Sequence, residues 1–277
     1  MLRVRGVSSV DALRAHLLAA RLAGPIATTR ERSLVRYRLF AAGDPRALLG
    51  LEPEEDWPVA RLVGLMARRC GVSPDPGHVS GPDRIDPERT IAALDVFAER
   101  LGRAARRRSP VLLGTGHPHR LLEFYAILAR GLSAAGCHVL TPAQGRRIDM
   151  VTGFGVRPHT LRYVRGVALI RGTGVRPAAD APGAHSHSPL PVRVVLDAAA
   201  ALGGPLPELV IGDHGWICGA GQLGFEAIGP ADTDDPAVFV GEAEGKVRVA
   251  VPMDDSVLPE HYRPLARYVL NRSRLSR

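Results

Sequence analysis

One stretch, from Ser109 to Pro142, constrains the fold more than any other part of the chain. It begins with the apolar run Val111–Leu113, passes through a turn at Gly114–Pro118, and continues as a segment whose apolar residues have helical spacing. Gly136 ends that segment, and a second apolar run follows. This order predicts a βαβ unit with a right-handed crossover. We therefore expect an α/β protein with a Rossmann-like, mainly parallel sheet.

The turn inside this unit is a candidate anion site. Its glycines allow a ligand to approach the backbone closely, and the helix that follows presents unpaired N–H groups and the positive end of its dipole. We expect Gly114, Thr115, Gly116 and His117 to hold the phosphate of a small molecule. The alternative is a tight strand-to-helix turn with no ligand.

The chain before this unit is predicted to be mostly helical. Residues 1–108 are interpreted as a helical cap or lid, and residues 109–277 as the Rossmann-like domain, although one integrated domain is an alternative. Helices are expected over Val10–Leu22, after a cap at Thr28 or Thr29, over Pro58–Cys70, and after the cap Asp86.

Strands and helices alternate in the rest of the chain. Strands are expected at Ile148–Phe154, Val164–Ile170, Leu206–Ile211, Val238–Val240 and Val247–Val251, with a loop over Gly172–Gly183. Helices are expected from Val192 to Ala199, at Gly221–Ile228 and at Pro259–Leu270. In such a sheet, ligands bind at the carboxyl ends of the strands.

Charge and composition narrow the class of partner. The net charge is +8, but Lys246 is the single lysine, the arginines are scattered, and aromatic residues make up 5%. That pattern argues against nucleic acid and favours a small anionic substrate. Three separated cysteines form no disulfide framework, and no apolar run approaches the roughly 20 residues that span a bilayer. We expect a cytoplasmic protein with no membrane partner, and leave a homo-oligomer open.

Three polar clusters follow strands or precede helices, at Gly114–Pro118, His185–Pro189 and Gly212–Trp216. Turns of this kind meet at one edge of a doubly wound sheet, so their histidines are expected to share a cleft. The metal-ligand candidates are His185, His187, Asp213 and His214, which suit zinc, manganese or magnesium. Alternatively, these histidines only support other ligands, and Ser186 and Ser188 are helix caps.

Other phosphate or nucleotide chemistries have weaker support. Gly219–Gly224 matches GxGxxG, but it does not directly follow the strand that ends at Gly212, as the dinucleotide fingerprint requires. A nicotinamide-dependent oxidoreductase therefore remains an alternative. The chain has no Walker loop, no Cys-x5-Arg and no Asp-x-Asp-x-Thr. Hydrolysis would thus depend on histidine, a metal-activated water, or both.

Several segments together resemble an actinobacterial family commonly labelled phosphatase. The resemblance covers nearly the whole chain, with departures at Thr152–Gly183, which is longer and rearranged, and at His119, where glycine is usual. It rests on Ala27–Glu31, Gly43–Asp44, Asp83–Pro87, Thr115–Pro118, His185–Pro189, Asp213–Trp216, Asp234–Gly245 and Pro252–Asp255.

The resulting hypothesis is a phosphoric monoester hydrolase that acts on a small phosphorylated metabolite. The Gly114–His117 turn and Ser188 would hold the phosphoryl oxygens, and Arg30 would neutralise charge. His117, His187, Asp213 and His214 are the catalytic candidates, and the last three with His185 are the candidate ligands of a divalent metal ion. A non-catalytic binding module for a phosphorylated ligand is a further alternative.

Overall fold

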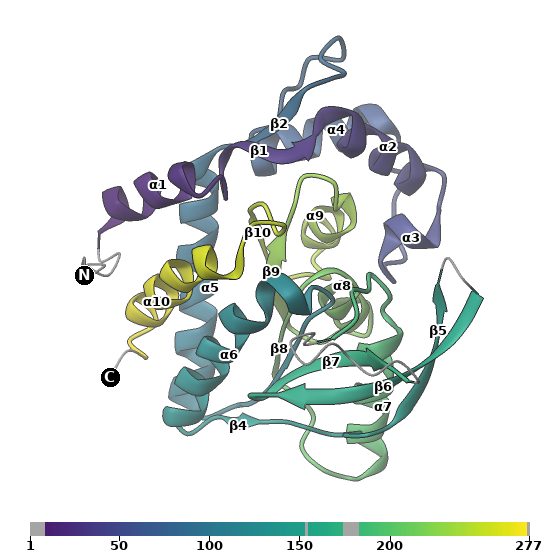
Figure 1. The fold of residues 1–277 in the computed structure, drawn as a ribbon, viewed down its shortest axis with the longest axis vertical. Helices are drawn as coiled ribbons and strands as arrows, with labels where there is room; N and C mark the ends of the chain where they lie inside the picture. Colours follow the sequence, from purple (N-terminus) through teal and green to yellow (C-terminus); the bar gives the residue numbers. More distant parts are fainter. Residues whose placement is uncertain (1–8, 153–154, 174–182, 276–277) are drawn as a thin grey trace.

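The computed structural model describes residues 9–152, 155–173 and 183–275. It is an α/β structure in which helices cover both faces of an eight-stranded sheet (Figure 1). The expected α/β class is confirmed. None of the helices in the described ranges is both long and apolar enough to cross a membrane.

The central sheet is mixed, with a mostly parallel part and an antiparallel edge. Its order is β10-β9-β8-β3-β7-β6-β5, and β4 also pairs with β3. Strand β6 is antiparallel to β5 and β7, whereas the other pairs are parallel. The strands are β3 (Pro110–Gly114), β4 (His138–Val139), β5 (Arg147–Thr152), β6 (Gly155–Val164), β7 (Val167–Gly172), β8 (Leu209–Ile211), β9 (Ala227–Ala231) and β10 (Val249–Pro252).

The βαβ unit is present as expected. Strand β3 leads through α6 (Pro118–Ala134) to β4, which is parallel to β3. Across the parallel part the order β4-β3-β8-β9-β10 reverses direction between β3 and β8, as in doubly wound sheets. The Rossmann-like assignment stays an interpretation of this order. In doubly wound sheets, ligands bind outside the carboxyl ends of the strands at such a reversal, which here are the ends of β3 and β8.

Two hydrophobic layers hold the sheet between them. Alternation along β3 sends Val111 and Leu113 into one layer and Leu112 into the other. The first layer contains α1 (Val10–Ala19), α5 (Pro87–Arg107), α6 and α10 (Arg263–Arg272); the second contains α2 (Arg30–Ala41), α4 (Val59–Cys70), α7 (Leu190–Ala201), α8 (His214–Gln222) and α9 (Pro236–Ala243). Each layer thus combines residues from before and after Ser109, as one integrated domain would, and the division at that point stays a prediction.

The N-terminal portion is less purely helical than expected. It also contains an antiparallel strand pair, β1 (Gly24–Thr29) and β2 (Pro82–Ile85), and the short helix α3 (Pro45–Leu48). A second short helix, η1 (Pro259–Tyr262), lies near the C-terminal end of the chain. Burial alternates along β1, which favours a strand with one face packed. The expected caps are confirmed: Thr29 accepts from the Arg32 N–H at 3.3 Å, and Asp86 from the Glu88 N–H at 2.9 Å.

Two expected elements in the C-terminal half are wrong. Val238–Val240 lies within helix α9, which begins at Pro236 and is buried on all sides, so its apolar run carries no helical period. The helix expected at Gly221–Ile228 begins earlier, at His214, and β9 already starts at Ala227.

The antiparallel edge also differs from expectation. The expected strand Val164–Ile170 is divided by a turn, because β6 ends at Val164 and β7 begins at Val167. The strand β6 itself was not expected. Of the strand expected at 148–154, the structure shows β5 as far as Thr152, and 153–154 lie outside the described residues. Most of the expected loop 172–183, at 174–182, lies outside them too.

Candidate functional site

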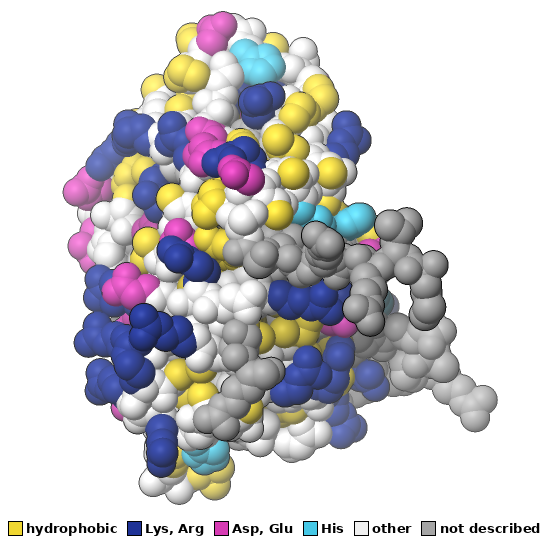
Figure 2. Space-filling view, turned by 90° about the vertical axis from the view of Figure 1, so that its left-hand side faces the viewer, with side chains coloured by type: hydrophobic (Ala, Val, Ile, Leu, Met, Phe, Trp, Pro, Cys, Tyr) yellow, Lys and Arg dark blue, Asp and Glu magenta, His cyan; other side chains and the backbone are white. Residues whose placement is uncertain are grey.

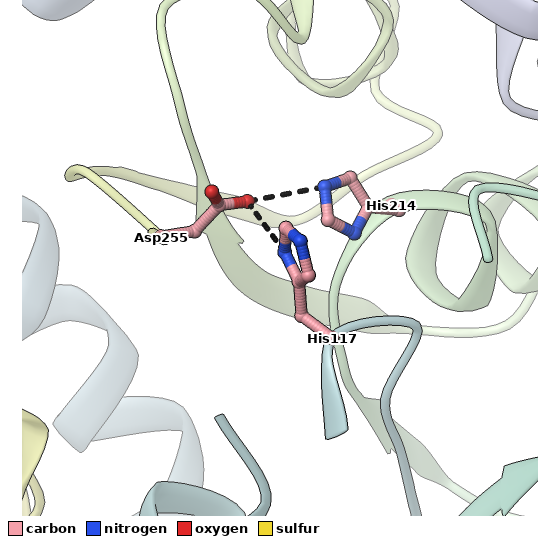
Figure 3. Close-up of side chains that lie close together, drawn as sticks. All are labelled: His117, His214 and Asp255. Carbon is pink, nitrogen blue, oxygen red and sulfur yellow. Dashed lines mark hydrogen bonds and ion pairs between the residues drawn. The ribbon is translucent and has the colours of Figure 1, made fainter. Parts of the chain in front are cut away.

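The candidate site lies where the segments after four neighbouring strands meet the segment before α7. It contains four histidines and several buried aspartates. His117 follows β3, Asp213 and His214 follow β8, Asp235 follows β9, Asp255 follows β10, and His185 and His187 precede α7. Figure 3 shows the side chains of His117, His214 and Asp255 pointing toward one another from three of these segments.

The four histidine rings pack against one another. His117 stacks on His185 with ring centroids 3.9 Å apart, and His187 stacks on His214 at 4.1 Å. The two stacks meet edge-on, with 4.8 Å between the centroids of His117 and His214. The structure thus brings together the histidines of all three polar clusters in the sequence.

His214 is the centre of this arrangement. Its side chain is 2% exposed, and its Nδ1 lies 3.0 Å from an oxygen of Asp213. Its Nε2 lies 3.1 Å from one oxygen of Asp235 and 3.1 Å from one oxygen of Asp255. If Nδ1–H donates to Asp213, a neutral ring turns its Nε2 lone pair toward two carboxylates. That contact requires either a proton on Nε2 or a cation among the three groups.

The aspartate beside His214 is held by the turn after β3. Its Oδ1 accepts the Gly116 N–H at 2.6 Å, and its Oδ2 accepts the Thr115 hydroxyl at 2.6 Å. Because both oxygens of Asp213 have protein donors, this side chain is placed to orient His214.

The two glycines of this turn contact protein. A Cβ on Gly114 would lie 2.2 Å from the ring of Trp216, and one on Gly116 would lie 2.0 Å from the Ser186 carbonyl oxygen. Such close contacts with protein are expected of a tight strand-to-helix turn that holds no ligand. Phosphate binding by Gly114, Thr115 and Gly116 stays a prediction.

Burial and neighbouring charges shift the pKa values of the histidines in opposite directions. Burial, with the nearby charge of His214, lowers the pKa of His187 to about 2. Burial, with the charge of His117, lowers the pKa of His185 to about 4. For His214, burial alone would lower the pKa, but the carboxylates of Asp235, Asp213 and Asp255 raise it well above its usual value. The ring of His187 is therefore neutral, so one of its nitrogens has a lone pair that can bind a cation beside these carboxylates.

Two buried atoms in this cluster have no hydrogen-bond partner among the described residues. They are Nε2 of His187 and Oδ1 of Asp235. Unpaired buried polar atoms are costly, and these two belong to side chains that lie close together: ligand atoms of His187, His214 and Asp235 lie within 4.8 Å of one another, which suits a shared cation. Three groups of side chains have ligand atoms within 4.8 Å of one another and could hold a metal ion: His117, His214 and Asp255; His187, His214 and Asp235; Asp232, Asp254 and Asp255.

Sequence reasoning found the histidines and Asp213 but missed Asp235 and Asp255. The available signal was a pair of aspartates shortly after each of two apolar runs: Asp234-Asp235 follows β9 after Asp232-Thr233, and Asp254-Asp255 follows β10 after Met253. Interpreting Val238–Val240 as a strand concealed the first pair, because it placed those acids before a strand and not after one.

Arg30 does not reach this cluster. Its side chain is buried beneath the β1–β2 pair, where Nε donates to the His78 carbonyl at 3.1 Å and Nη2 to the Ser73 carbonyl at 2.9 Å. Nη1 lies 3.8 Å from the buried carboxylate of Asp83. The expected charge-neutralising contact with a substrate is replaced by these internal contacts.

Ser188 lies beside the histidines as a helix-terminal residue. Its hydroxyl accepts the Leu190 N–H at 3.2 Å, and its own N–H donates to the Ser186 hydroxyl at 3.1 Å. The N-cap of α7 is Pro189, which has no side-chain cap bond, so Ser188 contacts the first helical N–H while Ser186 contacts only the turn that precedes the helix.

The GxGxxG segment does not form a phosphate-binding turn between a strand and a helix. Gly219 and Gly221 lie inside α8, two turns beyond the end of β8. A Cβ on Gly219 would meet Pro189 at 2.8 Å, and one on Gly221 would meet the Lys246 carbonyl oxygen at 2.4 Å. The glycines permit close packing, and the nicotinamide alternative loses the motif that supported it.

Comparison with known proteins identifies the family. Residues 8–277 match the model of the family described as Phosphatase. The chain belongs to this phosphatase family. It is 38% identical over 274 residues to the protein named Phosphatase SCO2771 of Streptomyces coelicolor, covering 98% of this chain and 99% of that relative. The resemblance to an actinobacterial phosphatase family is confirmed.

In this member of the phosphatase family, the donor atoms suit a divalent metal ion. Imidazole with carboxylate is a common ligand set for zinc and also serves manganese, whereas magnesium prefers oxygen ligands and several waters. The Asp213–His214 contact is the carboxylate–histidine pair that orients many metal-binding histidines. The orphaned atoms of His187 and Asp235 fit the same interpretation.

Proposed function

We propose that this protein is a phosphoric monoester hydrolase that acts on a small phosphorylated metabolite, such as a sugar or nucleoside phosphate. The observation that carries the proposal is the environment of His214 Nε2, which faces the carboxylates of Asp235 and Asp255 at 3.1 Å each. His187, His214 and Asp235 would hold a divalent ion, and its positive charge would offset the two carboxylates that face Nε2. Such an ion, when bound, supplies positive charge that stabilises the phosphoryl oxygens in the transition state.

The protein's own side chains then divide the remaining tasks. His117 is 16% exposed and its Nδ1 contacts Asp255 at 3.2 Å, which leaves Nε2 to give a proton to the leaving oxygen. Arg120, on the first turn of α6, lies close enough to lower the pKa of Asp254, although burial has the larger and opposite effect on that group. Its guanidinium makes no hydrogen bond to a described residue and takes the phosphate-binding role first assigned to Arg30.

Phosphate release tests this proposal. The purified chain is supplied with zinc, manganese or magnesium and assayed on a panel of sugar and nucleoside monophosphates, with a phosphodiester for comparison. We expect release from at least one monoester, loss of activity with chelator, and a fall of at least ~100-fold in Asp235→Asn, which weakens the ion site. Asp149→Asn is the matched control because Asp149 is an exposed residue of β5, remote from the site.

Three results would argue against the proposal. They are absence of release from every monoester with each ion present, equal activity of Asp235→Asn and the parent, or preference for the diester. A binding module for a phosphorylated ligand would instead be stabilised by a monoester without releasing product, and would retain that binding in His187→Ala. The cytoplasmic location expected from the sequence belongs to the same proposal, and the three buried, unpaired cysteines suit it.

A further inference from the structure

One cavity of the described structure lies away from the histidine cluster. It has a volume of about 1120 Å³ and is bounded by α6, α10 and the turn between β6 and β7. Two glycines let these walls come together: a Cβ on Gly131 of α6 would lie 2.6 Å from Leu270 of α10, and Gly166, at φ +82°, presses its turn against Val139 and Ala129. The cavity is thus a feature built by three converging elements.

Arginine dominates the charge of this cavity. Arg130, Arg165, Arg263 and Arg267 line it, and the single acidic residue in its lining is Glu123. Glu123 is already engaged by Arg263, with bonds of 2.8 and 2.9 Å. The other three arginines form no salt bridge with a described residue. Figure 2, which faces the α10 side of the molecule, shows several Lys and Arg side chains on this face, some of them beside hydrophobic ones.

The arginines of the lining are exposed, and a bound anion would reduce the repulsion among these like charges. We propose that this cavity binds a small polyphosphorylated molecule at a second site, separate from the His/Asp cluster. The guanidinium groups of Arg130, Arg165 and Arg267 would take the phosphate oxygens, since arginine binds phosphate through paired N–H donors. The aliphatic side chains of the wall, Ile127 and Leu270 among them, would contact an organic part of the ligand.

Other occupants fit the cavity less well. A second copy of the chain docked through the same face would bring arginines against arginines. A nucleic acid strand is favoured by aromatic side chains for base stacking, and the lining of this cavity contains none. A compact anion can contact several of the exposed arginines that line the cavity without either difficulty.

Binding of inorganic triphosphate, followed by calorimetry in the presence of chelator, tests this inference. We expect saturable binding at one site, and a dissociation constant about 10-fold larger for each arginine removed in Arg130→Ala and Arg267→Ala. The control is the double variant Arg38→Ala/Arg248→Ala, which removes two exposed arginines outside the cavity and should bind within about 2-fold of the parent. ATP should bind at the same site and adenosine should not.

Several outcomes would overturn the inference. Absence of triphosphate binding would do so, as would equal weakening in the Arg38/Arg248 control, which would indicate general attraction to a basic protein. Loss of binding in Asp235→Asn, with binding intact in Arg130→Ala, would assign the anion to the His/Asp cluster. Binding of adenosine as strong as that of ATP would show that the phosphates are not what is recognised.

Discussion

Replacement of Asp235 by asparagine tests whether the buried cluster holds a divalent ion. Oδ2 of Asp235 lies 3.1 Å from His214 Nε2, and its Oδ1 is buried without a partner. Asparagine keeps the volume and removes the charge that an ion would neutralise. The change therefore isolates metal binding from packing.

The expected effect is a change in the thermal response to metal. An ion that binds the folded state and is present at 100 times its dissociation constant stabilises that state by about 2.7 kcal/mol. For a chain of this size, that corresponds to an increase in Tm of roughly 5–10 °C. Asp235→Asn loses a charged ligand, so its Tm should increase by less than about 2 °C at the same metal concentration.

The assay is a melting curve by circular dichroism on chelator-treated protein, with zinc, manganese or magnesium added back. Asp149→Asn on the exposed edge strand should retain the full increase in Tm. Equal increases in Asp235→Asn and the parent would refute the assignment of Asp235 as a ligand. No increase in the parent with any of the three ions would mean that His214 Nε2 carries a proton and the cluster is a buried ion-pair network.

Three further changes probe packing and buried charges in the histidine cluster and at the separate Arg30–Asp83 pair. Gly116→Ala places a Cβ 2.0 Å from a backbone carbonyl oxygen and should lower the free energy of unfolding by about 1–3 kcal/mol in urea titrations. The control is Gly204→Ala, whose Cβ has nothing within 4 Å and which should change that free energy by less than about 0.5 kcal/mol. Arg30→Met leaves the carboxylate of Asp83 buried and uncompensated, so it should cost about 3–5 kcal/mol of stability; an unchanged unfolding midpoint would show that this pair is not structural. The pKa of His185 is about 4 in the folded protein against 6.5 in the unfolded chain, so the unfolded chain binds the extra proton as pH falls from 6.5 to 4. The chelator-treated protein should therefore lose stability over this range. His185→Gln should flatten that part of the plot of unfolding free energy against pH.

Local patterns predicted the parts of the fold that depend on neighbours in sequence. The βαβ unit follows from an apolar run, a glycine turn and a helical period that are all adjacent, and the caps at Thr29 and Asp86 follow from residue type within one turn. The meeting of the histidine segments also followed, because the carboxyl ends of parallel strands share an edge.

What the sequence concealed depends on contacts far along the chain. The strand β1 pairs with β2, which lies beyond three intervening helices, so neither strand is marked by a hairpin turn. Helix α9 is buried on every side, and an apolar run buried in this way has the same composition whether it is a strand or a helix. That ambiguity hid Asp235, the residue on which the metal assignment most depends.

The N-terminal portion contacts the loops that carry the buried aspartates. Its β1–α2 segment packs on the loops after β9 and β10: the Ala27 N–H donates to Asp254 at 3.0 Å, and the Thr28 hydroxyl donates to Asp232. Arg32 donates to Asp234 at 2.6 Å. These contacts give hydrogen-bond donors to Asp232, Asp234 and Asp254, here called the outer aspartates. Asp235 and Asp255, the inner pair, face His214. Because the outer acids have protein partners, the negative charge that remains for a cation is concentrated at the inner pair, beside the two stacked pairs of histidines.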